Sequence, residues 1–177
     1  MTDFSRGGVL ARFFSGLCEY VFEGRLGMAD PPLVDYLSDL MLRFARFDSV
    51  HRVRNLTGRP VLEVADMLIE AENRVGLARR DVHRHIGDVT LFWTGVYPES
   101  LPTLKATDKK DFFVDYCAQG KRAYYIASTI KTDRDEDTPN TLLERLSHDF
   151  EMCAYGLGEV RREWERRDND GRRLLVE

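Results

Sequence analysis

The stretch His83–Pro98, HRHIGDVTLFWTGVYP, predicts the helix around which the fold is built. A helical step of 100° per residue places an apolar stripe along one side of it, formed by Val82, Ile86, Val89, Trp93 and Val96. A second face carries only the small residues Gly87, Thr90 and Thr94. Because another helix backbone could approach closely there, we expect this helix to be surrounded by protein.

The edge of the apolar stripe holds the first candidate site. His85 and Asp88 are one helical turn apart and border the buried face. One interpretation is structural, in which Asp88 accepts a hydrogen bond from His85 or both satisfy nearby helix ends. The functional interpretation makes the pair a general base with its orienting acid. Neither interpretation identifies a nucleophile, because no serine or cysteine lies in a recognised catalytic motif.

Aromatic side chains with polar tips suggest a small-molecule pocket near the same residues. They are Trp93, Tyr97, Tyr116, Tyr124 and Tyr125. Pockets in helical bundles are lined by aromatic residues with a few placed polar groups. The candidate ligand-binding residues are therefore His85, Asp88, Trp93, Tyr116 and Tyr124. The alternative is that these aromatic side chains are simply core.

Composition indicates a single folded domain. The chain has 177 residues, 43% of them hydrophobic and 32% charged, with a formal net charge of −4. We expect one helical domain over residues 1–170 and a tail over 171–177, irregular from about Asp168 onward. Three widely spaced cysteines, Cys18, Cys117 and Cys153, are interpreted as reduced core residues.

Hydrophobic periodicity predicts about six helices and no strand, an all-α antiparallel bundle. Asp30 and Pro31 form the cap and first position of the second helix, and Gly76 either separates the third and fourth helices or kinks one long helix. The six segments are Val9–Glu23, Pro31 to Phe47, Pro60 to about Gly76, the His83 segment, Asp108 to about Lys131, and a helix from Thr138 and Pro139 past Trp164.

The last predicted helix has the most regular pattern. Its apolar residues alternate three and four apart, as in a coiled-coil seam: Leu143, Leu146, Phe150, Cys153, Leu157, Val160 and Trp164. The seam extends beyond the point that short neighbouring helices can easily cover. We therefore expect a symmetric homodimer formed through this helix.

Metal and nucleic-acid sites are not expected. The Glu-x-x-His pair of two-metal bundles is absent. The reversed pair His148-x-x-Glu151 points away from the seam, and Glu63, Asp66 and Glu70 lie opposite the apolar stripe of their own helix. Five arginines between Arg43 and Arg59 could attract phosphates, but few free aromatic residues accompany them, so a solvated helix end is the favoured interpretation.

Three stretches, HIGDVTLFWTGVYPESL, DFFVDYCAQGKRAYYIAS and GMADPPLVDYLSDLMLRF, resemble a family of uncharacterised bacterial helical proteins. In that family a Gly-Asp, Leu-Phe, Gly and Pro precede a tyrosine-containing helix with a Gly and an Ala-Tyr. The likeness runs from about Gly27 to Ser128. It implies no activity and no catalytic residue for this chain.

Together these patterns favour a noncatalytic, cytoplasmic helical binding or interaction protein that self-associates, without cofactor, metal, nucleic acid or membrane. The N-terminal segment lacks the features of a signal peptide, and the uncharged stretch Val89–Tyr97 is too short to cross a bilayer. The alternative is a small enzyme or ligand sensor with a pocket around His85, Asp88 and Trp93.

Overall fold

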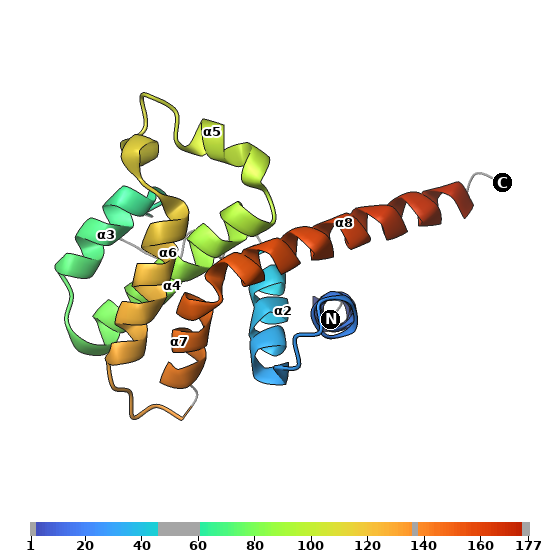
Figure 1. Cartoon of the computed structure of the whole chain (residues 1–177), viewed down its shortest axis with the longest axis horizontal. Helices are drawn as coiled ribbons and strands as arrows, with labels where there is room; N and C mark the ends of the chain where they lie inside the picture. The colour runs from blue at the N-terminus through green and yellow to red at the C-terminus, as the bar shows by residue number, and fades with distance from the viewer. Residues whose placement is uncertain (1–2, 46–60, 136–137, 175–177) are drawn as a thin grey trace.

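The chain is all-helical over the residues that the computed structural model describes, which are 3–45, 61–135 and 138–174 (Figure 1). The all-α prediction is confirmed. These residues form eight α-helices rather than six, because the last expected helix is divided at Asp149 and the loop after Pro98 contains a short helix. The helices are α1 Asp3–Cys18, α2 Pro31–Ala45, α3 Val64–Glu72, α4 Gly76–Gly95, α5 Leu101–Leu104, α6 Tyr116–Thr129, α7 Asn140–His148 and α8 Phe150–Leu174.

Local capping signals fix several helix ends. The Asp30 carboxylate accepts a hydrogen bond from the Leu33 amide at 3.4 Å, and Pro31 is the first residue of α2, as predicted. Gly76 has a φ of +57°, a left-handed conformation that a residue with a side chain rarely adopts. The chain turns there, so α3 and α4 are separate helices.

The start of α6 differs from the prediction. The helix begins at Tyr116, capped by Asp115, whose carboxylate accepts the Ala118 amide at 3.0 Å. The preceding residues Lys110–Phe113 form a 3-10 turn, which changes the helical phase. Phe113, which a continuous helix from Asp108 would place on its packing face, is therefore 91% exposed. Asp108 and Asp111 resemble the acidic start of a helix in the sequence, but Asp111 caps α3, since its carboxylate accepts hydrogen bonds from the amides of Val64 at 2.9 Å and Ala65 at 2.7 Å.

Two expectations for the third predicted helix are wrong. The helical periodicity after Pro60 places Val64, Ala71 and Val75 on an inward stripe. Val75 is nevertheless 84% exposed, because α3 already ends at Glu72. Glu70, expected to be solvated, is buried and lies within 3.5 Å of Arg74 one turn later. Val64 and Ala71 are buried as predicted.

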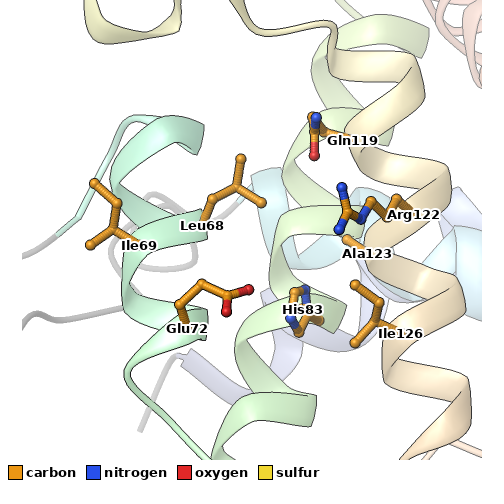
Figure 2. A pocket seen from close by; sticks show the side chains of 8 residues that line it. All are labelled: Leu68, Ile69, Glu72, His83, Gln119, Arg122, Ala123 and Ile126. Atoms are coloured by element: carbon orange, nitrogen blue, oxygen red, sulfur yellow. The ribbon is translucent and has the colours of Figure 1, made fainter.

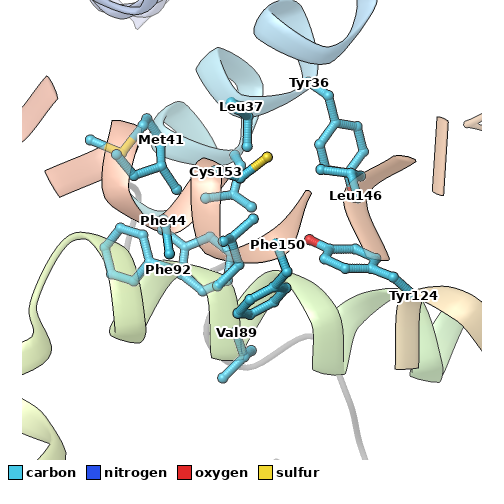
Figure 3. Packing of buried hydrophobic residues seen from close by; sticks show 14 of the residues in the cluster. Tyr36, Leu37, Met41, Phe44, Val89, Phe92, Tyr124, Leu146, Phe150 and Cys153 are labelled. Carbon is cyan, nitrogen blue, oxygen red and sulfur yellow. The ribbon is translucent and has the colours of Figure 1, made fainter. Parts of the chain in front are cut away.

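The helix of the opening stretch is central. Helix α4 packs against α2, α3, α6 and α8, and most of its residues from Val82 onward are buried. Its small-residue face meets α6 closely: a methyl group on Gly87 would lie 2.6 Å from the Tyr124 ring, and one on Gly120 would overlap Thr90. The core beside it contains stacked Phe44 and Phe92 (Figure 3).

The seam of the last predicted helix is buried within the chain and shared by α7 and α8. Leu143, Leu146, Phe150, Cys153, Leu157 and Val160 are fully buried. The end of the seam is covered by α1, because Trp164 packs edge-on against Phe13 and Phe14 at ring-centroid distances of 6.2 and 5.5 Å. The premise of the dimer prediction is therefore wrong, and the dimer itself stays a prediction.

Helix α8 runs on past α1 and projects from the body (Figure 1). It continues to Leu174, although the chain was expected to become irregular from about Asp168. Ion pairs one turn apart, such as Arg166 with Glu163 and Asp170, line this part of the helix.

None of the helices in the described ranges is long and apolar enough to span a membrane. Most of the arginine-rich stretch, residues 46–59, and Phe47 lie outside the described residues.

Candidate functional site

Asp88 lies at the centre of a buried polar cluster that joins α2, α4 and α6. Its Oδ1 accepts hydrogen bonds from the hydroxyl groups of Tyr36 at 2.6 Å and Tyr124 at 2.7 Å. Its Oδ2 accepts one from Nη1 of Arg43 at 2.8 Å. Arg84 completes the cluster by donating from Nε to the Tyr36 hydroxyl at 3.3 Å. Both carboxylate oxygens are thus occupied by donors from this chain.

The electrostatics of the cluster favour an ionised Asp88. Burial acts to raise the pKa of its carboxyl, but the positive charges of Arg43 and Arg84 outweigh burial and lower this pKa below its ordinary value. Burial and the neighbouring Asp88 charge raise the pKa of Tyr36 and that of Tyr124, so both phenols stay protonated. The two phenols and the Arg43 guanidinium thus supply this buried carboxylate with hydrogen-bond donors.

Of the residues predicted from sequence, the structure brings Asp88 and Tyr124 together. His85 is buried as predicted, and its ring lies nearly parallel to Phe44 with centroids 6.5 Å apart. Trp93 lies more than a turn further along α4, packed against Phe92 and Tyr97. Tyr116 belongs to a different cluster, because its hydroxyl donates to Asp111 at 2.6 Å.

Tyr36 and Arg43 were not predicted as partners of Asp88. They are seven residues apart on α2, so they share one face of that helix, beside its apolar stripe. The sequence did show that Tyr36 and Arg43 flank the core-facing apolar stripe of α2. The sequence alone does not pair that face with α4, since Tyr36 and Asp88 are separated by 52 positions along the chain.

A cleft of about 310 Å³ lies on the other side of α4, between α3 and α6 (Figure 2). Helix α4 forms its floor through His83. Its lining combines an apolar set with polar and charged residues from both walls: Leu68, Ile69, Glu72, His83, Gln119, Arg122, Ala123 and Ile126. Figure 2 shows the His83 ring between Glu72 of α3 and Ile126 of α6.

His83 is the unusual residue of this cleft. Its side chain is 2% exposed, and neither ring nitrogen has a hydrogen-bond partner in the described part of the chain. Burial, followed by the charge of Arg79, lowers the pKa of its imidazole to about 4, so the ring is neutral near pH 7. A neutral imidazole offers one donor and one acceptor, and leaving either unsatisfied in a buried place costs about 1 to 3 kcal/mol.

The cysteines and the possible metal ligands of the described residues were the other candidates for a reactive site. Burial raises the pKa of the Cys18 and Cys153 thiols to about 12, so both are protonated, and all three cysteines are free. Within residues 3–45, 61–135 and 138–174, no group of three or more His, Cys, Asp or Glu side chains is placed to hold a metal ion.

Comparison of the chain with protein-family models, with curated proteins and with solved structures found no match.

Proposed function

We propose that this chain is a noncatalytic binding protein whose ligand site is the cleft between α3, α4 and α6. The observation that supports this is His83, a buried imidazole that lines the cleft with both nitrogens unpaired in the described part of the chain. Buried polar groups in folded proteins nearly always have partners. A ligand with a hydrogen-bonding group would supply a partner that the described part of the chain does not.

The function is proposed to be noncatalytic because the other candidate reactive groups, Asp88 and the buried thiols, are already engaged or protonated. Asp88, the residue with the clearest potential as an acid or base, is engaged on both oxygens by Tyr36, Tyr124 and Arg43. The buried thiols of Cys18 and Cys153 are held in their protonated, unreactive form. The cleft is thus better suited to recognition than to bond making.

The cleft lies on the other side of α4 from Asp88, so it replaces the pocket expected around His85, Asp88 and Trp93 as the proposed ligand site. Asp88 is only 1% exposed, and its donors come from the helices that enclose it. A ligand could reach Asp88 only by displacing these internal hydrogen bonds. The cleft over His83 requires no such displacement.

Fragment screening by NMR tests the proposal. A library of small neutral, acidic and basic fragments should give hits that shift the resonances of Ala123, Ile126 and the His83 ring while leaving Tyr36 unchanged. His83→Leu should weaken these hits, and His148→Leu, which alters an exposed histidine on α7, should not. A library that shifts none of the cleft resonances would overturn the proposal.

A further inference from the structure

The cleft presents two more polar side chains without partners, both from α6. The Arg122 guanidinium and the Gln119 amide form no hydrogen bond or ion pair with the described residues. Figure 2 shows both side chains extending from α6 toward the space above His83. Arg122 and Gln119 are three residues apart, so they lie on the same face of α6.

The charges at the two walls differ. On the α3 side Glu72 is within 3.6 Å of Arg79, so its negative charge is largely balanced. On the α6 side the charge of Arg122 has no such counterpart in the described chain. His83 is neutral near pH 7 and adds a hydrogen-bonding group rather than a charge. Among the charged residues that line the cleft, the Glu72 carboxylate is thus paired with Arg79, and the Arg122 guanidinium is left to interact with a ligand.

The walls around these polar groups are apolar. Leu68 of α3 extends toward Ala123 and Ile126 of α6, and Ile69 contributes to the lining from the outer side of α3 (Figure 2). Ile69 is 59% exposed, which is a large apolar exposure for a residue at the rim of a cleft. The volume of about 310 Å³ is at the small end of ligand pockets, which span roughly 300 to 1,000 Å³.

We propose that the cleft binds a small organic monocarboxylate with an aliphatic or aromatic body. The ligand carboxylate would accept hydrogen bonds from Arg122, Gln119 and the N–H of His83, and the body would pack between Leu68, Ile69 and Ile126. A planar guanidinium matches a carboxylate in geometry and charge. This inference rests on the proposed function, since it names the ligand class of the same cleft.

Other ligand classes fit the same residues less well. An ammonium group in place of the carboxylate would face the like charge of Arg122. A phosphate dianion would bring two negative charges to one unpaired cation. A neutral apolar molecule would bury Arg122, Gln119 and His83 without satisfying them.

Three probes that differ only in the head group test the ligand class: hexanoate, hexanamide and hexylamine. Calorimetry at pH 7 should show hexanoate binding at least about tenfold more tightly than the other two, because it gains hydrogen bonds to a charged group. Arg122→Gln should remove this preference. Arg12→Gln, at an exposed arginine of α1, is the matched control and should leave it unchanged.

The NMR titration of His83 gives a second readout. Bound hexanoate should raise the pKa of His83 from about 4, because it adds a negative charge to the surroundings of Glu72, Arg79 and Arg122. Equal binding of hexanamide, or an Arg122→Gln variant that still prefers hexanoate, would overturn the carboxylate inference and leave the proposed function standing. If none of the three probes shifts His83, the carboxylate inference fails, and the proposed function fails only if the fragment library also gives no hit there.

Discussion

Asp88 and Asp39 contact the same guanidinium in opposite environments, so they separate the effect of burial from that of charge. Asp88 is buried and Asp39 is exposed, and each carboxylate is 2.8 Å from Arg43. Asp88→Ala should lower the free energy of unfolding by about 3 kcal/mol, because it leaves a partly buried cation and two phenols without their acceptor. Asp39→Ala should change it by less than about 0.5 kcal/mol. Urea denaturation of both variants checks this, and similar midpoints would contradict the buried cluster.

His83 should reduce the stability of the protein. His83→Leu should raise the free energy of unfolding at pH 7 by about 1 to 3 kcal/mol, because it removes two unsatisfied buried nitrogens. His148→Leu, at an exposed site, should have little effect. A histidine with a structural role would give the opposite sign for His83→Leu.

The stabilising effect of His83→Leu should also depend on pH. The pKa of His83 is lowered in the folded state, from 6.5 to about 4, so the unfolded chain binds more protons between these values. The free energy of unfolding of the wild type is therefore highest above pH 6.5 and declines as the pH falls toward 4. The variant lacks this decline because it has no imidazole at position 83. The stability difference between them should widen by about 2 kcal/mol from pH 7 to pH 5. Urea denaturation at both pH values measures it, and a constant difference would mean that His83 titrates normally.

At the scale of the elements, the contact between α4 and α6 depends on two glycines. A methyl group on Gly120 would overlap Thr90 and lie 2.5 Å from the Phe150 ring. Gly120→Ala should therefore destabilise the protein by about 1 to 3 kcal/mol, against the usual preference of a helix for alanine. Gly16→Ala in α1 is the control, since nothing lies within 4 Å of the added methyl, and it should be neutral or stabilising. Thermal unfolding of the two variants should give shifts of opposite sign or clearly different size.

At the scale of the whole molecule, Trp164 joins the two ends of the chain through its contacts with Phe13 and Phe14. Trp164→Glu should undock α1, with a loss of about 3 kcal/mol and faster hydrogen exchange in that helix. Light scattering of the wild type tests the predicted dimer separately. A dimer that Trp164→Glu converts to monomer without faster exchange in α1 would show that Trp164 makes its main contact with a second copy.

The sequence by itself determined what depends on near neighbours in the chain. Periodicity of 3.6 residues predicted the all-α class and the burial of His85 and Asp88, and the pair Asp30 and Pro31 marked the start of α2. The small residues around Gly87 predicted that another helix would approach α4 closely, and the structure shows that this helix is α6. Each of these signals acts over one or two helical turns.

Only the tertiary structure decided which faces meet. Asp88 is paired with Tyr36 and Arg43 because α2 packs across α4, and α3 is capped by Asp111 from 47 positions away. The phase of α4 sets His83 away from the apolar stripe, and it is the placement of α3 and α6 that buries this residue at the floor of a cleft. Contacts between distant segments depend on how helices pack, which local propensity does not encode.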